Sequence, residues 1–254
     1  MAQSFFPRFW NTGRAAKQHA LPEGLRVYAV GDVHGRFDCL ERLEARIARH
    51  EANAGAADET LVIFLGDYID RGPASREVVK HLSRGQFAGL STRYLLGNHE
   101  DAMLGFLDDP ASHVEWLNYG GMATLASYGV RAPGGMESAN LAAMQQGLAD
   151  AVPYAHLQFL RDLELWIELG DYLFVHAGIR PGLELKVQRR MDLLTIREPF
   201  LSTKAKLPWR VVHGHTVLPQ AILGQYRISL DTGAYATGRL SCAVIQGDSA
   251  VLLD

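Results

Sequence analysis

The sequence contains little cysteine, with only Cys39 and Cys242 in a chain of 254 residues. The two lie far apart and form no C-x-x-C pair, so their spacing indicates neither a disulfide framework nor a thiolate metal site. We expect both to be reduced, buried thiols of a cytoplasmic protein, and neither to act as a nucleophile.

Long apolar runs and a strong charge of either sign are also missing. No stretch approaches the roughly 18 consecutive apolar residues of a membrane helix, and the N-terminus lacks the apolar centre of a signal peptide. The formal net charge is −3, so no overall basic field attracts nucleic acid or an anionic membrane. We expect no nucleic-acid partner and no stable membrane association, and the oligomeric state is left open.

The composition is that of a folded chain, since 48% of its residues are hydrophobic. This is enough for one large domain, or for a domain with an insert. We divide the chain into an N-terminal arm (1–24) and a domain (25–254) with a helical insert at about 101–161. The arm is expected to pack on the body or on a second subunit, and the insert to cover the site and set substrate choice.

The most informative stretch covers residues 61–72 and reads LVIFLGDYIDRG. A short apolar run, of the length of a strand covered on both faces, stops at Gly66 and is followed by Asp67, Asp70 and Arg71. The same design recurs along the chain, in alternation with segments of helical periodicity. This alternation predicts an α/β fold with a largely parallel central sheet. Strands are predicted at 25–30, 61–65, 92–96, 165–169, 172–175, 211–212, 226–230, 240–245 and 250–253.

Polar side chains that can bind a metal follow the ends of these strands. Oxygen and imidazole ligands without a thiolate suit manganese, iron or zinc. Asp67 is the natural bridge, because a carboxylate shared by two ions places them roughly 3.5 to 4 Å apart, as in-line displacement at phosphorus requires. The candidate ligands are Asp32, His34, Asp67, Asn98, His176 and His215.

Two further residues could complete the hydrolysis of a phosphate ester. Arg71 offers a planar fork that matches phosphate oxygens, and His99, next to Asn98, can protonate the leaving group. Asp70 would orient the imidazole of His99 and keep it protonated.

Other histidines and acids have simpler interpretations. We expect the first turn of a helix to contain Glu100 and Asp101, where acidic residues favour the helix dipole rather than bind metal. The histidines expected on the surface or in the core are His19, His50, His81, His113 and His156.

Five motifs together resemble the calcineurin-like metallophosphoesterases, in particular the branch of phosphoprotein phosphatases, lambda phosphatase and bacterial diadenosine tetraphosphatases. They are GDVHG (31–35), GDYIDRG (66–72), GNHE (97–100), HAG (176–178) and GHT (214–216). The resemblance implies a four-layer α/β/β/α sandwich with two mixed sheets and a dinuclear site at their C-terminal edge. The resemblance implies a first metal bound by Asp32, His34 and Asp67, and a second bound by Asp67, Asn98, His176 and His215. It also implies that His99 is the general acid, that Asp70 orients His99, and that Arg71 binds the phosphate.

Details of the motifs indicate which branch of the family the sequence resembles most. The second histidine of the G-H-x-H motif of many phosphodiesterases is replaced by Val217, so the pattern is similar to the phosphomonoesterases instead. The segment 196–200 looks like the one that supplies a second phosphate-binding arginine, here Arg197. His213 is expected to be structural or to support a ligand. Asp231 either orients a ligand histidine or is an ordinary turn residue.

The sequence thus predicts a metal-dependent phosphoesterase in which a metal-bridging hydroxide attacks phosphorus and His99 protonates the departing oxygen. Phosphoserine and phosphothreonine proteins, or other small phosphate esters, are the preferred substrates, and Mn²⁺ the preferred metal. The runner-up is symmetric hydrolysis of dinucleoside tetraphosphates. An inactive protein that binds phosphorylated partners is disfavoured because every ligand and the acid are present, and a nucleic-acid phosphodiesterase because the second histidine and a basic track are missing.

Overall fold

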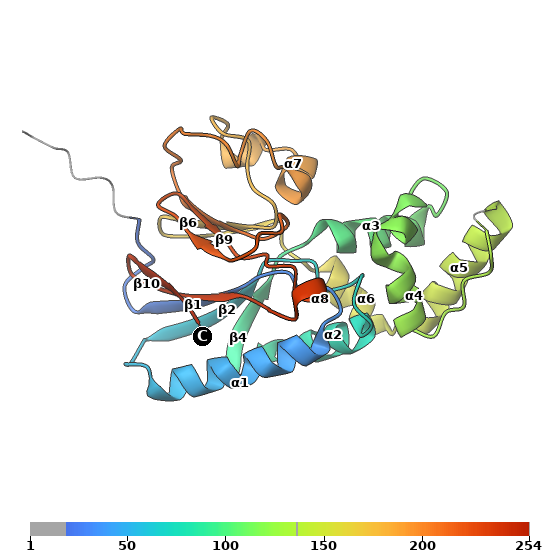
Figure 1. Cartoon of the computed structure of the whole chain (residues 1–254), viewed down its shortest axis with the longest axis horizontal. Helices are drawn as coiled ribbons and strands as arrows, with labels where there is room; N and C mark the ends of the chain where they lie inside the picture. Colours follow the sequence, from blue (N-terminus) through green and yellow to red (C-terminus); the bar gives the residue numbers. More distant parts are fainter. Residues whose placement is uncertain (1–18, 136, 254) are drawn as a thin grey trace, which may run out of the picture.

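The protein contains two sheets that lie face to face between outer layers (Figure 1). A computed structural model describes residues 19–135 and 137–253. The first sheet consists of β1 (Leu25–Val30), β2 (Glu59–Phe64), β3 (Gln86–Phe87), β4 (Leu90–Tyr94), β10 (Cys242–Gln246) and β11 (Ser249–Leu252), in the order β11-β10-β1-β2-β4-β3. The second consists of β5 (Trp166–Leu169), β6 (Tyr172–Val175), β7 (Arg210–His213), β8 (Ile222–Leu223) and β9 (Arg227–Ser229), in the order β5-β6-β7-β9-β8.

Both sheets are parallel at their centre and antiparallel at their edges. In the first sheet β1, β2 and β4 run parallel, and in the second β6, β7 and β9 do. The other pairings are antiparallel, so both sheets are mixed. Because parallel strands end at the same edge, the polar residues that follow them are brought together.

Three apolar clusters hold the layers together. Helix α1 (Phe37–Asn53) and α2 (Ser75–Leu82) cover the outer face of the first sheet, burying α1 side chains such as Leu40 against it. Between the sheets, Val27 and Ile63 of the first share a cluster with Phe174 of the second. On the outer face of the second sheet, α7 (Arg190–Thr195) and the segment after it pack through Leu193 and neighbours. This is the four-layer arrangement expected from the resemblance.

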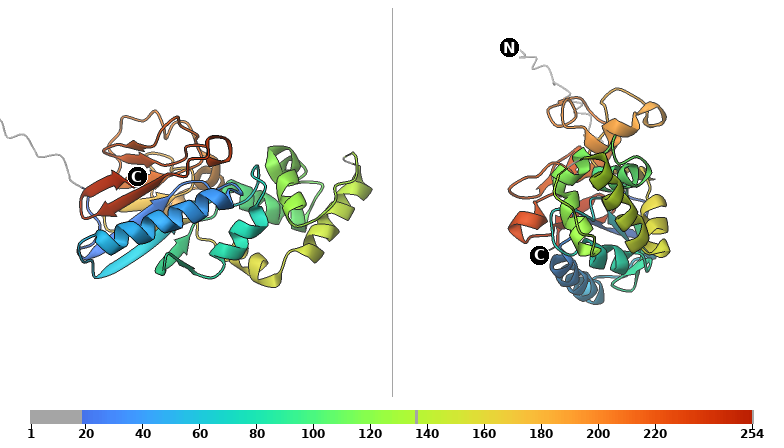
Figure 2. Two further views of the ribbon diagram at one scale, coloured as in Figure 1. Left: turned by 60° about the horizontal axis from the view of Figure 1, so that its bottom comes forward. Right: turned by 90° about the vertical axis from the view of Figure 1, so that its right-hand side faces the viewer.

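A group of helices lies beside the sheets, on the right of Figure 1 and of the left view of Figure 2. It consists of α3 (Asn98–Asp108), a π-helical turn η1 (Leu117–Gly121), α4 (Met122–Ser127), α5 (Ser138–Ala151) and α6 (Tyr154–Arg161). The helical pattern is interrupted at Gly120, whose φ of 119° only glycine adopts readily. We refer to residues 98–161 as the helical region; it begins three residues before the expected insert, because Asn98 and His99 form the first turn of α3.

The N-terminal arm lies mostly outside the described residues. Of its described part, Leu21 is buried between the sheets, and its backbone N–H donates to the carbonyl of Gly247 at 2.8 Å. Both cysteines are buried and free. None of the helices in residues 19–135 and 137–253 combines the length and apolarity that a bilayer crossing needs.

Candidate active site

The edge where the parallel strands end has an unusual backbone. His34, Asp67, Asp70, Arg71 and His215 have positive φ angles of 44°, 54°, 73°, 66° and 61°. A non-glycine residue in this region costs of order 1 kcal/mol or more, and persists only where surrounding contacts impose it. Such residues cluster at functional sites, and these five follow strands that are far apart in the sequence.

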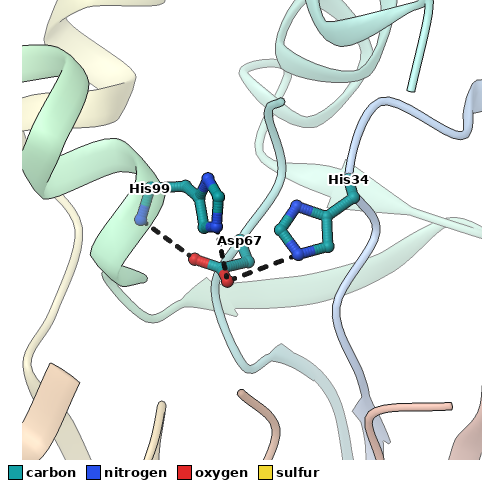
Figure 3. A group of neighbouring side chains, drawn as sticks. All are labelled: His34, Asp67 and His99. Carbon is teal, nitrogen blue, oxygen red and sulfur yellow. Dashed lines mark hydrogen bonds and ion pairs between the residues drawn. The ribbon is translucent and has the colours of Figure 1, made fainter. Parts of the chain in front are cut away.

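Asp67 lies at the centre of this edge and is 2% exposed. Its Oδ2 is 3.5 Å from Nε2 of His34, 3.5 Å from Nε2 of His176 and 3.9 Å from Nε2 of His99. Its Oδ1 accepts a hydrogen bond from the backbone N–H of His99 at 3.1 Å. Figure 3 shows the rings of His34 and His99 converging on the carboxylate from either side.

His34 and His176 each direct Nε2 toward Asp67. Nδ1 of His34 lies 2.9 Å from the carbonyl of Ile69, and Nδ1 of His176 lies 2.8 Å from the carbonyl of Leu65. A carbonyl only accepts, so Nδ1 of each ring carries a proton and Nε2 is the nitrogen that faces Asp67. Burial lowers the pKa of both His34 and His215 to about 3, so each imidazole is neutral, as a metal ligand must be.

Asn98 and His215 complete the second half of the site. Oδ1 of Asn98 lies 3.0 Å from Nε2 of His176 and 2.9 Å from Nδ1 of His215. Among the described residues, two groups of three side chains could each hold a metal ion, and both groups contain Asp67. Within each group, the donor atoms lie within 4.8 Å of one another. The groups are His34, Asp67 and His99, and Asp67, His176 and His215.

The carboxylates of the site fit divalent cations. Asp32, which accepts from the backbone N–H of His215 at 3.0 Å, has a pKa raised by burial and by the nearby carboxylates of Asp231 and Asp67. Asp231 is 1% exposed; Oδ1 accepts from the N–H of Gly233 at 2.8 Å, and Oδ2 has no partner among the described residues. Repulsion between buried carboxylates is relieved by a cation, which the imidazole and amide donors beside them also fit. Asp231 thus makes a turn contact and lies close to Asp32.

His99 is paired differently from the other histidines. Its Nδ1 lies 2.6 Å from Oδ2 of Asp70, and its Nε2 lies 3.1 Å from Nη2 of Arg71. Burial alone would lower the pKa of His99, but Asp67 and Asp70 outweigh it and raise the pKa above its ordinary value. The guanidinium of Arg71 lies 4.7 Å from the centre of the Tyr235 ring. Arginine only donates, so an N–H of Arg71 points at Nε2 of His99, and the guanidinium and the imidazole lie side by side.

Arg197, like Arg71, is exposed; it lies in the segment that follows α7. Its charge contributes to the lowered pKa of His215, so it lies close enough to act on the second donor group electrostatically. The structure therefore places Arg197 at the margin of the site.

Glu100 has a contact that the sequence interpretation missed. It lies in the first turn of α3 as expected, but it is fully buried, and its carboxylate accepts from the backbone N–H groups of Asp67, Tyr68, Ile69 and Gly97 at 2.7 to 3.1 Å. Burial and the charge of Asp67 raise the pKa of Glu100, whereas the bonds from the backbone N–H groups favour its ionised carboxylate. A glutamate at the third position of a helix signals a cap, but nothing in the sequence signals the bonds to residues 67–69.

Trp116 and Thr124 were missed as well: both lie within the predicted helical insert, and both bond to Asp70. The remaining histidines are structural or exposed. His213 is buried with Nε2 2.8 Å from Oγ of Ser229, and His156 lies 3.0 Å from the hydroxyl of Tyr128.

Comparison with known proteins identifies phosphoesterases as relatives of this chain. The family model of calcineurin-like phosphoesterases matches residues 25–244. The asymmetrical bis(5′-nucleosyl)-tetraphosphatase PrpE of Bacillus velezensis is 23% identical over 235 residues, covering 84% of this chain and 86% of that protein. A symmetrical bis(5′-nucleosyl)-tetraphosphatase of Acidovorax ebreus is 31% identical over 161 residues, 62% of this chain and 45% of its own.

Solved structures share the fold. A candidate diadenosine tetraphosphatase superposes with a TM-score of 0.62 at 24% identity, covering 89% of this chain and 92% of that one. A cold-active protein-tyrosine phosphatase of a psychrophilic Shewanella superposes with a TM-score of 0.57 at 19% identity, covering 91% and 81%.

Proposed function

The chain belongs to the calcineurin-like phosphoesterase family, and we propose that it hydrolyses phosphate monoesters with two divalent metal ions, phosphoserine and phosphothreonine proteins being the first candidates. The observation that supports this most is the arrangement around Asp67. Two donor groups share this carboxylate, and the His99–Asp70 pair lies directly beside it.

The donor set suggests how the metals are held. His34, Asp67 and Asp32 would bind one ion, and Asp67, Asn98, His176 and His215 the other. Oxygen and neutral imidazole ligands favour Mn²⁺, with iron or zinc as alternatives. When bound, the ions would supply Lewis-acid charge to the phosphate oxygens and activate the attacking water.

The chain's own residues would bind the phosphate group and supply the proton. Arg71, whose guanidinium lies against Tyr235, presents N–H donors that match two phosphate oxygens. The Nδ1–H of His99 donates to Asp70, and in the structure its Nε2 accepts from Arg71. When the guanidinium turns to the phosphate oxygens, Nε2 would be free to carry the proton for the departing oxygen, and the neighbouring carboxylates, which raise the pKa of His99, favour this protonated form. These roles require no covalent bond between the protein and phosphorus.

A second candidate is the hydrolysis of dinucleoside tetraphosphates. It is favoured by the names of the relatives, one of which aligns with 84% of this chain. Tyr119, 63% exposed, precedes Gly120, whose carbonyl lies 3.4 Å from the backbone N of Arg71. Tyr235, 38% exposed, lies against Arg71 and offers a ring on which a base could stack.

Initial rates distinguish the two candidates. Protein stripped of metal and reconstituted with Mn²⁺ is given a phosphothreonine peptide or diadenosine tetraphosphate at matched concentrations. Faster turnover of the peptide is expected for a phosphatase of proteins. Faster turnover of the dinucleotide assigns the second candidate, and no turnover of either, or of simple aryl phosphates, contradicts a hydrolytic function.

A further inference from the structure

The carboxylate of Asp70 is held by more than its histidine. Asp70 is fully buried, and its Oδ2 accepts hydrogen bonds from Nδ1 of His99 at 2.6 Å and from Nε1 of Trp116 at 2.8 Å. Its Oδ1 accepts from the hydroxyl of Thr124 at 2.5 Å. A carboxylate removed from water needs such donors, since an unpaired charge in a dry site is costly.

Thr124 fixes the backbone of Asp70 as well as its side chain. The N–H of Asp70 donates to Oγ1 of Thr124 and to Oγ of Ser75, both at 3.0 Å. The threonine hydroxyl therefore accepts from one end of the residue and donates to the other. These bonds hold Asp70 at a φ of 73°, a conformation that a residue with a Cβ rarely adopts.

Trp116 is itself fixed by packing. It is 2% exposed and lies against Phe106, with ring centres 5.1 Å apart. On another side lies Gly121, where a Cβ atom would come within 2.6 Å of the indole ring. An indole N–H donates in only one direction, so a ring held in this way aims its proton at Oδ2 of Asp70.

Both donors come from the helical region rather than from the sheets. Trp116 precedes η1 and Thr124 lies in α4, 46 and 54 residues after Asp70 in the sequence. The same segment contacts the next residue, since the carbonyl of Gly120 lies 3.4 Å from the backbone N of Arg71. The helical region thus covers the turn that presents both Asp70 and Arg71.

We propose that Trp116 and Thr124 are positioning residues for His99, acting through Asp70. The inference rests on the proposed function, in which the Nε2–H bond of His99 breaks and the proton passes to the departing ester oxygen. A carboxylate held at both oxygens cannot rotate, so it holds the imidazole in one orientation. Loss of either donor leaves the metal ligands untouched and lets the His99–Asp70 pair move. We expect kcat to fall about 10- to 100-fold where the leaving group needs the proton, with little change in KM.

The test uses Thr124→Val, Thr124→Ser and Trp116→Phe in the full chain reconstituted with Mn²⁺. Thr195→Val and Trp209→Phe are matched controls, because Thr195 bonds within α7 and Trp209 bonds to Glu168 on the second sheet. For each variant, kcat and KM are measured with phenyl phosphate, a poor leaving group, and 4-nitrophenyl phosphate, a good one. Bound Mn²⁺ is measured on the same samples.

For Thr124→Val and Trp116→Phe, the proposal predicts a larger loss of kcat with phenyl phosphate than with 4-nitrophenyl phosphate. Bound Mn²⁺ should stay at the wild-type level in both variants. Thr124→Ser should recover the kcat that Thr124→Val loses. In a His99→Asn background, Thr124→Val should cause no further loss. Equal losses with both substrates, a Ser variant as impaired as the Val variant, or additive losses in the double variant would overturn it. If the wild-type protein hydrolyses neither ester, the proposed function fails instead, so the two failures are distinguishable.

Discussion

At the scale of single residues, the partner of one imidazole nitrogen decides what the other can do. In His34 and His176, Nδ1 faces a backbone carbonyl, which directs Nε2 toward Asp67. In His99, Nδ1 faces the carboxylate of Asp70, which favours the protonated ring. In the proposed function, one residue type would therefore serve as a metal ligand at two positions and as a proton donor at a third.

This assignment predicts the effect of His99→Asn. Because the variant cannot protonate the leaving oxygen, kcat with phenyl phosphate should fall by about 10²- to 10⁴-fold, and less with 4-nitrophenyl phosphate. Bound Mn²⁺ should stay at the wild-type level, with His113→Asn as the exposed control. A loss of bound Mn²⁺ in parallel with kcat would show that His99, which lies in a donor group with His34 and Asp67, is a ligand instead.

A histidine outside the site predicts a pH dependence of stability. The pKa of His156 is lowered by burial and by the charges of Arg76 and Lys80, so the folded protein holds this ring neutral. The unfolded chain takes up the proton as the pH falls below about 6.5, so stability is lost in that direction. The melting temperature should therefore drop less between pH 7.5 and 5.5 in His156→Gln than in the wild type. An equal drop in both would contradict this linkage.

The metal-binding residues predicted from the sequence share one property, which Trp116 and Thr124 lack. Asp67, Asn98 and His215 each follow an apolar run closely, so the pattern of a strand and its end reveals them. Trp116 and Thr124 reach Asp70 only because the chain returns to it in three dimensions. Their spacing fits an ordinary helix core, and no local pattern separates the two cases.

At the scale of elements, the first turn of α3 fixes the loop that contains Asp67. Glu100 uses Oε1 for the N–H groups of Tyr68 and Ile69, and Oε2 for those of Asp67 and Gly97. One carboxylate therefore joins the start of α3 to the turn after β2, next to the metal-binding groups.

Glu100→Gln should disrupt the hydrogen bonds between the start of α3 and the turn after β2. Glutamine has one acceptor oxygen, so its amide N–H₂ would face two backbone N–H groups and leave them unpaired. We expect a loss of about 1 to 3 kcal/mol in the free energy of unfolding and weaker Mn²⁺ binding. Urea unfolding and Mn²⁺ titration measure the two effects. Asp101→Asn, which removes the partly exposed ion pair with Arg190, is the control and should change neither by a comparable amount.

Gly120, in the helical region, is packed directly against the backbone of Arg71. At Gly120, where φ is 119°, a Cβ atom would lie 2.8 Å from the backbone N of Arg71. Gly120→Ala should displace Arg71, raise KM for phosphate esters and cost about 1 to 3 kcal/mol of stability. Gly134→Ala, where a Cβ atom meets nothing within 4 Å, is the matched control. Wild-type KM in Gly120→Ala would show that this contact does not position the arginine.

At the scale of the whole molecule, the sequence predicted the elements better than their assembly. Apolar runs revealed the strands, but β3 and β8 have two residues each, too few for any pattern. That the strands form two sheets rather than one came from the resemblance alone, because an apolar run does not state its partner. The helical region was predicted from the helical spacing of its apolar residues, whereas its contact with the turn at Asp70 depends on packing between distant segments.

The proposed function requires that the two donor groups, which follow strands of different sheets, act together through the Asp67 that they share. The most direct measurement is Mn²⁺ bound per chain, together with phenyl phosphate hydrolysis, for wild type and Asp67→Asn as metal is restored to stripped protein. We predict two ions per chain and activity that appears with them in the wild type, and loss of both tight binding and hydrolysis in the variant. Hydrolysis by the stripped protein, or a variant that binds and hydrolyses like the wild type, would contradict the central claim.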